Sequence, residues 1–176
     1  MNTYIKVSET EMRHFQFIEF CLLTSSQYLI MSVIVGLDGY TLPGQFVLKE
    51  MCLIYPNEEY NHYLFKKPAG FLSNMAMKTV RYTTENLNNL SYEDGDIPYT
   101  IIPEILGKVK DLRIFTYSDI AVRFLQMHLP TTSIENIQHR GYKMPTTLPN
   151  PKCFRLHNPR YCARAKALAV KKFLNM

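Results

Sequence analysis

Three side chains that often bind metal ions lie close together near the C-terminus of this 176-residue chain: Cys153, His157 and Cys162. Two thiolates and one imidazole that converge on a point supply three corners of a tetrahedral zinc site. The spacing Cys-x3-His-x4-Cys is a weaker signal than two paired Cys-x2-Cys motifs. Cys162 could instead pack a helix against a sheet, because cysteine is among the most frequently buried residues. A zinc site therefore requires a fourth ligand from elsewhere in the chain.

The residues around Cys162 indicate a helix. The run Arg160–Leu174 is rich in alanine and leucine and contains neither glycine nor proline, a composition that favours a helix. Asn158 is a good N-cap, and Pro159 suits the first helical position. We therefore expect Cys162 on the first helical turn, where the positive end of the helix dipole favours its thiolate form.

A carboxylate stands in an apolar setting in the strand predicted over Gln45–Tyr55. Side chains alternate between the two faces of a strand. Glu50 would then share its face with four apolar residues, Phe46, Leu48, Cys52 and Ile54. A carboxylate there must be paired, hydrogen-bonded or bound to a metal, because burying a bare charge is costly. A salt bridge with a buried lysine or arginine is the alternative to a metal-ligand role.

Basic residues are concentrated in the C-terminal segment. The chain carries a net charge of +5, and from Arg140 to its end it has nine lysines and arginines and no acidic residue. Clustered basic side chains are typical of proteins that bind nucleic acids. A helix face exposed to solvent is the alternative interpretation. The predicted metal segment and the basic segment therefore coincide.

The predicted elements follow the order β-β-β-α-β-α-β-α. Strands are predicted over Ser32–Leu37, Gln45–Tyr55, Asn61–Phe65, Asp111–Thr116 and Ile134–Ile137, with turns at Asp38-Gly39 and Pro43-Gly44. Helices are predicted over Asn74–Leu90, Tyr99–Leu106, Asp119–Leu129 and the C-terminal run. The first has Met75, Val80, Leu87 and Leu90 facing inward, and Ser118 or Asp119 caps the third. Three sequential strands followed by alternating helices and strands predict an α/β fold, a mixed sheet flanked by helices.

Composition narrows the class of protein. A chain with 47% hydrophobic and 20% charged residues suits one domain with a substantial core. Four unevenly spaced cysteines do not form a secreted disulfide framework, so we expect an intracellular location. Residues 1–30 are too polar for a membrane span and do not resemble a signal peptide. We expect them to form a peripheral extension of a domain over residues 31–176, and we expect no membrane partner.

The order of elements resembles the ribonuclease H-like fold in its DEDD (DnaQ-like) exonuclease branch. The last motif of that branch looks like His-x4-Asp-Ala-x-Ala, and this chain reads His157-Asn-Pro-Arg-Tyr-Cys162-Ala163-Arg-Ala165. Cys162 thus replaces the aspartate, and the opening Asp-x-Glu is reduced to Asp38 alone. Thiolates bind Zn²⁺ well and Mg²⁺ poorly. Two-metal exonuclease activity is therefore not expected.

A glutamate on a strand combined with Cys, His and Cys near the last helix is similar to the Maelstrom domain, a ribonuclease H-like branch from the piRNA pathway. That resemblance implies one structural zinc ion held by Glu50, Cys153, His157 and Cys162. Such a site is closed, so the metal would stabilise the fold rather than activate water. The resemblance also implies a link to RNA, in small-RNA or transposon silencing.

Three functions follow as hypotheses. The first is binding of single-stranded RNA, with basic side chains neutralising phosphates and Tyr142, Phe154 and Tyr161 stacking on bases. Its candidate basic residues are Arg140, Lys143, Lys152, Arg155, Arg160 and Arg164. The second is an endoribonuclease that uses some of His62, His128, His139 and Glu135. The third is a catalytically inactive scaffold for protein partners, with contacts through residues 71–82 and 138–151.

Overall fold

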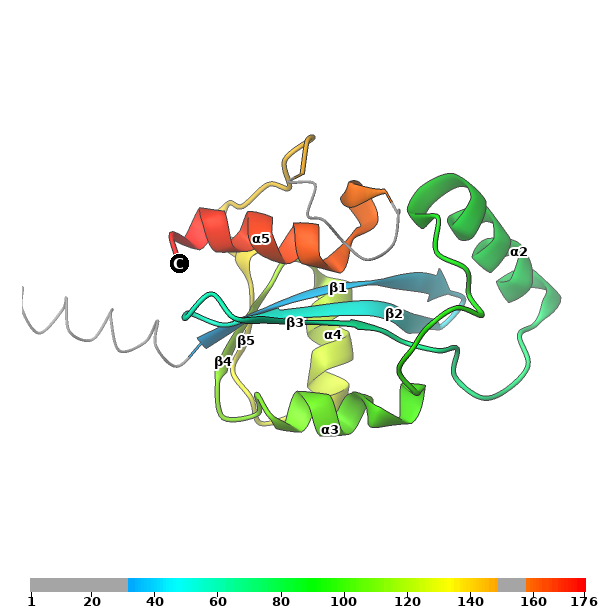
Figure 1. Cartoon of the computed structure of the whole chain (residues 1–176), viewed down its shortest axis with the longest axis horizontal. Coiled ribbons are helices and arrows are strands. Elements are labelled where there is room, and N and C mark those ends of the chain that lie inside the picture. The colour runs from blue at the N-terminus through cyan, green and yellow to red at the C-terminus, as the bar shows by residue number, and fades with distance from the viewer. Residues whose placement is uncertain (1–31, 149–157) are drawn as a thin grey trace, which may run out of the picture. The chain divides into compact units, whose positions relative to one another are not determined.

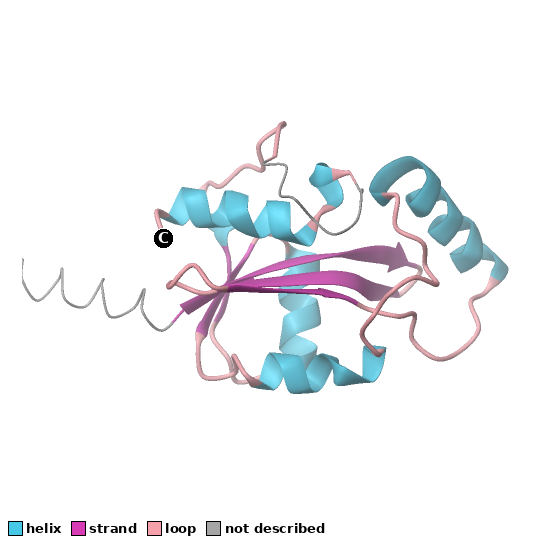
Figure 2. Ribbon diagram, in the orientation of Figure 1, coloured by secondary structure: helices cyan, strands magenta, loops and turns pink. Residues whose placement is uncertain are grey.

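Five strands form one mixed sheet in the described part of the chain (Figures 1 and 2). The computed structural model describes residues 32–148 and 158–176. The strands are β1 (Ser32–Leu42), β2 (Gln45–Ile54), β3 (Tyr60–Leu64), β4 (Arg113–Thr116) and β5 (Ile134–Asn136), in the spatial order β3-β2-β1-β4-β5. The pairs β1–β2 and β2–β3 are antiparallel, whereas β1–β4 and β4–β5 are parallel. The predicted α/β class, with an antiparallel meander inside a mixed sheet, is confirmed.

Helices cover both faces of the sheet. The α-helices are α2 (Asn74–Thr83), α3 (Ile102–Gly107), α4 (Asp119–His128) and α5 (Ala163–Leu174). Shorter helical turns are η1 (Thr84–Asn88), η2 (Tyr99–Ile101), η3 (Ile137–Arg140) and η4 (Pro159–Tyr161). Helix α5 lies over one face of the sheet, α3 and α4 lie under the other, and α2 lies beyond the end of β1 (Figure 1). The peripheral extension that we predict over residues 1–30 lies outside the described residues.

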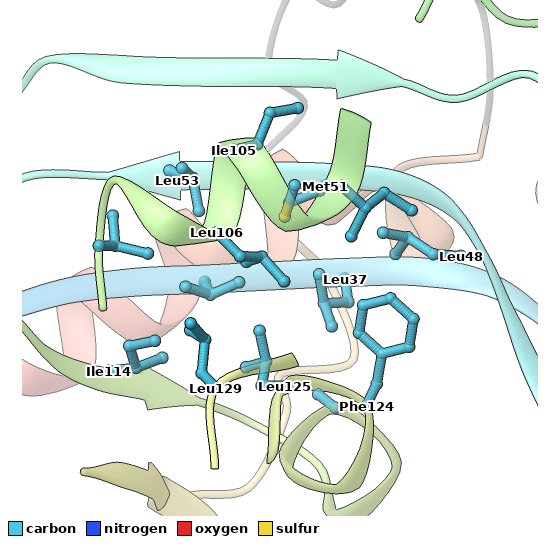
Figure 3. Packing of buried hydrophobic residues seen from close by; sticks show 14 of the residues in the cluster. Leu37, Leu48, Met51, Leu53, Ile105, Leu106, Ile114, Phe124, Leu125 and Leu129 are labelled. Atoms are coloured by element: carbon cyan, nitrogen blue, oxygen red, sulfur yellow. The ribbon is translucent and has the colours of Figure 1, made fainter. Parts of the chain in front are cut away.

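Two hydrophobic cores lie on the two faces of the sheet. Side chains from α3 and α4, including Ile105, Leu106 and Leu125, pack on Leu37 and Met51 of the sheet (Figure 3). On the opposite face, the core contains Ile34, Cys52, Ile54 and the alanine-rich side of α5. Helix α5 is therefore packed on β1 and β2 through small side chains.

A β-bulge at Lys49 changes which residues of β2 share a face. Asp38 pairs with Glu50, but the next residue, Gly39, pairs with Leu48, so Lys49 is the extra residue in β2. The alternation predicted for the whole strand is therefore wrong for the residues that precede Lys49. Cys52 and Ile54 lie on the α5 face as expected with Glu50, whereas Leu48 belongs to the core under α3 and α4.

Other element boundaries in the structure also differ from those predicted from the sequence. The predicted turn at Asp38-Gly39 lies inside β1, and the chain turns after Leu42 instead. The helix predicted over Asn74–Leu90 is α-helical only to Thr83, continues as the π-turn η1 and ends at Asn89 with positive φ. Met75, predicted to face inward, is 63% exposed, whereas Leu90 is buried. Ser118 caps α4 as predicted, by accepting a hydrogen bond from the Ala121 N–H.

Helix α5 packs closely against β1 at Gly36. A Cβ atom at this position would lie 2.1 Å from the carbonyl oxygen of Ala163 and 3.0 Å from the Cβ of Ala167. Because the Ala163 carbonyl is backbone, it cannot turn aside as a flexible side chain can. Glycine at position 36 therefore sets the distance between the sheet and the start of α5.

Gly36→Ala should lower the free energy of unfolding by about 1–3 kcal/mol, because the added methyl group pushes α5 off the sheet. The measurement is chemical denaturation, with Gly107→Ala as the matched control. No heavy atom lies within 4 Å of a Cβ added at Gly107, and alanine favours a helix over glycine. Equal destabilisation of the two variants would contradict the close packing of α5 on β1.

Candidate metal centre

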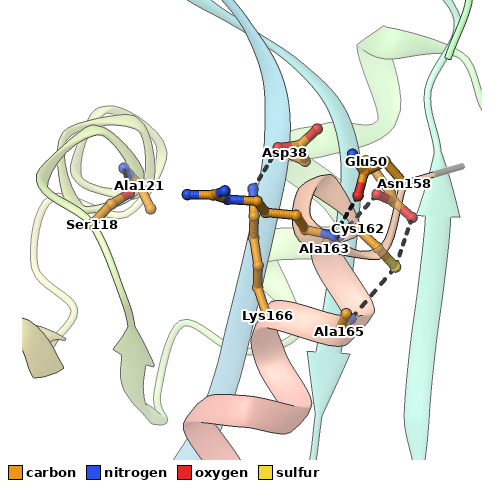
Figure 4. A network of polar contacts seen from close by, with 10 residues as sticks. Asp38, Glu50, Ser118, Ala121, Asn158, Cys162, Ala163, Ala165 and Lys166 are labelled. Carbon is orange, nitrogen blue, oxygen red and sulfur yellow. Dashed lines mark hydrogen bonds and ion pairs between the residues drawn. The ribbon is translucent and has the colours of Figure 1, made fainter. Parts of the chain in front are cut away.

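Glu50 is buried, with 1% of its surface exposed, and its partners come from three elements. On β3, His62 Nε2 lies 2.5 Å from Glu50 Oε1. On α5, the Ala163 N–H donates to Glu50 Oε2 at 2.8 Å. Cys162 Sγ lies 3.8 Å from Glu50 Oε1 (Figure 4). The positive end of α5 and the imidazole ring thus both stabilise the negative charge of the carboxylate.

Cys162 is the N-cap of α5 rather than a residue of its first turn. The thiol sulfur accepts a hydrogen bond from the Ala165 N–H at 3.4 Å, and α5 begins at Ala163 (Figure 4). Asn158, the predicted cap, instead accepts a hydrogen bond from the Arg160 N–H and caps the short helix η4. The Cys162 residue is buried, with 1% of its surface exposed. It therefore faces both the backbone amides of α5 and the Glu50 carboxylate.

Register explains how His62 reaches this site. In the antiparallel pair β2–β3, His62 lies directly opposite Cys52, two residues from Glu50. Paired residues and residues two apart point to the same face of a sheet. His62 therefore projects from β3 beneath the N-terminus of α5. His62 is an acid/base candidate in the sequence, and the hairpin register places it beside Glu50.

Ligand atoms of Glu50, His62 and Cys162 all lie within 4.8 Å of one another, close enough for one metal ion. Zinc–oxygen bonds of about 2.0 Å and zinc–sulfur bonds of about 2.3 Å place two tetrahedral ligands about 3.5 Å apart. The 3.8 Å between Cys162 Sγ and Glu50 Oε1 is close to this separation. The 2.5 Å between His62 Nε2 and Glu50 Oε1 is a hydrogen-bond distance and too short for two ligands of one ion. The observed geometry therefore fits Glu50 and Cys162 as ligands and His62 as the partner that orients Glu50.

Two of the four predicted ligands, Cys153 and His157, lie outside the described residues. The other two, Glu50 and Cys162, are brought together although they lie 112 positions apart in the sequence. Among the described residues, the partners of Glu50 include His62 and the Ala163 N–H. The carboxylate of Glu50 and the thiol of Cys162, at the start of a helix and beside the His62 imidazole, can contribute to a metal site.

A second buried charged pair lies beside this cluster. Lys166 Nζ, on α5, is 2.5 Å from Asp38 Oδ1, on β1, and both residues are 7% exposed (Figure 4). Burial raises the pKa of Asp38 to about 6, although the neighbouring Lys166 lowers it. Burial lowers the pKa of Lys166, but the attraction of Asp38 outweighs this effect, and the net direction is upward. Lys166 belongs to the basic C-terminal segment, and no local pattern in the sequence indicates that it pairs with Asp38.

The predicted basic surface is only partly available. Lys143 and Arg160 are exposed. The Arg140 guanidinium group is bound to Glu135, with Nη2 and Oε2 at 2.8 Å. The guanidinium of Arg164 lies 4.0 Å over the ring centre of Tyr60, which is 47% exposed. The two remaining candidates, Lys152 and Arg155, lie outside the described residues.

One predicted aromatic contact to RNA was wrong. Tyr142 is buried, packs edge-on against Phe173 and donates a hydrogen bond to the sulfur of Met144. Tyr161 is half-buried and lines a pocket beside Lys166. Phe154 lies outside the described residues.

The acid/base candidates do not form one site. His62 lies on β3 and Glu135 on β5, which are the two edges of the sheet. His128 packs against the Phe124 ring, and burial lowers its pKa. Burial raises the pKa of Glu135, but hydrogen bonds from Arg140 and Arg113 outweigh it and hold the pKa below its usual value. The separation of His62 from Glu135 gives no support to acid/base catalysis that combines these two residues.

Comparisons with known proteins add no relative: no protein-family model, curated protein or solved structure matches this chain. Within the described residues, every helix is too short or too polar to cross a membrane.

Proposed function

We propose that this chain is a single-stranded RNA-binding module of a degenerate ribonuclease H-like fold, in which one structural zinc ion fixes the basic C-terminal segment to the sheet. The observation that carries the proposal is that Glu50 and Cys162 lie together at the start of α5. Cys162 is also within ten residues of Cys153 and His157 in the sequence. The order of elements, three antiparallel strands followed by alternating helices and strands, supports the ribonuclease H-like fold.

The zinc ion would bind Glu50, Cys153, His157 and Cys162 and leave no position for water. Glu50 belongs to β2, and the other three ligands belong to the segment that leads into α5. The ion would therefore cross-link the sheet to the C-terminal segment. Its contribution is structural, because a site closed by four protein ligands stabilises a fold rather than activating a nucleophile.

The zinc site would position the basic side chains that we propose bind RNA. Cys162 stands between Arg160 and Arg164, so a metal that fixes Cys162 also fixes the places of these two guanidinium groups. Tyr60, exposed beneath Arg164, offers a ring on which a base can stack. Guanidinium groups would neutralise backbone phosphates without reading the sequence. The role of such binding in small-RNA or transposon silencing is part of the same proposal.

Single-stranded RNA should bind the full chain with an affinity that falls steeply with salt, as measured by fluorescence anisotropy of a labelled oligonucleotide. Arg160→Ala combined with Arg164→Ala should weaken binding at low salt. It should also reduce the slope of log K against log salt by about 0.7 for each phosphate contact that is lost.

The matched control is Lys108→Ala combined with Lys110→Ala, which removes two exposed charges beside α3, on the face of the sheet opposite α5 (Figure 1). Its binding should equal that of the native chain. Absence of salt-dependent binding by the native chain would contradict the proposal, as would an equal loss in the control.

A protein-interaction scaffold is the second candidate, and one observation favours it. Four large apolar side chains on and before α2 are exposed by 56–106%: Phe71, Met75, Met77 and Tyr82. Exposed apolar patches often mark protein contacts. If the native chain shows no binding to RNA while its metal content is intact, this surface becomes the better-supported site of function.

A further inference from the structure

The carboxylates of Asp38 and Glu50 face the same α-helix from adjacent strands. The two residues are register partners across β1 and β2, next to the bulge at Lys49. Both are buried. Burial raises the pKa of Asp38, and the negative charge of Glu50 raises it further. Two carboxylates held this close in a low-dielectric environment require a compensating cation.

The chain supplies that cation itself. Lys166 reaches from α5 to Asp38, with its ammonium group 2.5 Å from Oδ1. The rings of Tyr117 and Tyr161 also lie near this group, with centres 5.8 Å and 5.9 Å from Nζ. Both distances are within the range of cation–π attraction. The ammonium group is therefore held by one carboxylate and two aromatic rings.

Coordination at Asp38 is incomplete with this monovalent cation. Asp38 Oδ2 is buried and, among the described residues, has no hydrogen-bond partner. Asn88, a fully buried residue, lies near this carboxylate: burial raises the pKa of Asp38 and the Asn88 side chain lowers it, but Asn88 Nδ2 makes no hydrogen bond of normal geometry among the described residues. A buried carboxylate oxygen without a partner destabilises the fold, and a second bond to a cation would offset this cost. A pocket of about 260 Å³ reaches both Asp38 and Lys166, and its wall includes Thr41, Tyr117 and Ser118.

We propose that the Lys166 ammonium group occupies the place of a hard divalent cation at the Asp38 carboxylate and thereby closes this end of the sheet to Mg²⁺. Oxygen ligands of the kind present here, a carboxylate with nearby hydroxyl groups, suit Mg²⁺ or Mn²⁺. An ammonium ion provides one positive charge and only hydrogen bonds, so it compensates the carboxylate without offering an open coordination position. The inference goes beyond zinc or RNA binding and depends on neither.

Removal of the ammonium group tests the inference directly. We expect Lys166→Ala to bind one equivalent of Mn²⁺, seen as loss of the free-ion signal in electron paramagnetic resonance, whereas the native chain leaves that signal unchanged. Alanine suits this position because the neighbouring residues of α5 are also alanine. Addition of Asp38→Asn to Lys166→Ala should abolish the uptake, because an amide is a weak ligand for this ion.

Melting temperature provides a second readout if Lys166→Ala is unstable. Mn²⁺ should raise the melting temperature of Lys166→Ala, because the ion replaces the missing positive charge. It should leave the native chain and the Asp38→Asn/Lys166→Ala double variant unchanged. The inference is overturned by a folded Lys166→Ala that takes up no Mn²⁺, or by uptake that persists without Asp38. It is also overturned if Lys166→Ala stays unfolded with Mn²⁺ while the double variant folds.

Discussion

Chelation of zinc from the native chain should lower the free energy of unfolding by about 3–5 kcal/mol, the cost typical of leaving a buried charged group without its partner. Because the ligands come together only in the folded chain, metal binding contributes directly to the free energy of folding. Without the ion, Glu50 and Cys162 would remain buried against His62, and the cross-link between β2 and α5 would be lost. Urea denaturation with and without a chelator such as phenanthroline measures the difference.

Variants of the ligands separate loss of metal from loss of packing. Cys162→Ser should be less stable than the native chain and insensitive to the chelator, because it has no zinc to lose. Cys52→Ala is the control, since Cys52 is also a buried cysteine in the core under α5 but does not belong to the metal cluster. That variant should keep its sensitivity to the chelator. A native chain whose stability does not respond to chelation would contradict a structural zinc.

Lys49→Met should lower the free energy of unfolding by about 2–4 kcal/mol, since each buried carbonyl left unsatisfied costs about 1–3 kcal/mol. Lys49 is 1% exposed, and its ammonium group donates to the carbonyl oxygens of Phe65 and Tyr92 at 2.9 Å and 3.0 Å and also to that of Asp94. It thereby ties the β2 bulge to the loop 91–97. Methionine fills a similar volume but donates no hydrogen bond.

Lys78→Met is the matched control, because Lys78 is exposed on α2 and a surface substitution of this kind changes stability little. Hydrogen exchange identifies where Lys49 acts. The Lys66 N–H, which donates to the Ile97 carbonyl, should exchange faster in Lys49→Met and at the native rate in Lys78→Met. Unchanged protection at Lys66 together with unchanged stability would show that the bulge does not depend on this lysine.

Elements defined by local signals could be predicted from the sequence. The turn at Pro43-Gly44 separates β1 from β2 as expected, and Ser118 caps α4. Period and turn residues act over a few positions, so they are visible in the chain itself. The antiparallel meander and the helices on both faces followed from these local assignments.

The bulge at Lys49 could not be predicted, because it depends on long-range partners. A lysine in an apolar strand contradicts simple alternation, and its ammonium group is satisfied by carbonyls up to 45 positions away. The same limit applies to Asp38, whose partner Lys166 is 128 positions distant. Asp38-Gly39 has the composition of a turn, but pairing with β2 keeps both residues in the strand.

The candidate site was predicted in part. Glu50 was identified because a buried carboxylate needs a partner, and Cys162 because of its spacing from Cys153 and His157. The structure brings Glu50 and Cys162 together. His62 was missed as a member of the cluster because its position depends on the hairpin register, with Ile54 opposite Tyr60 and Cys52 opposite His62.

Zinc content of the purified full chain, with the absorption spectrum at the zinc K-edge, tests the metal centre most directly. We predict about one zinc ion per chain, with two sulfur and two nitrogen or oxygen ligands at distances of about 2.3 Å and 2.0 Å. Glu50→Gln and Cys162→Ser should lose the ion, whereas His62→Ala should bind it about 10–100-fold more weakly, as expected for loss of a hydrogen bond to a ligand. A native chain without zinc, or a Cys162→Ser variant that retains it fully, would contradict the proposed centre.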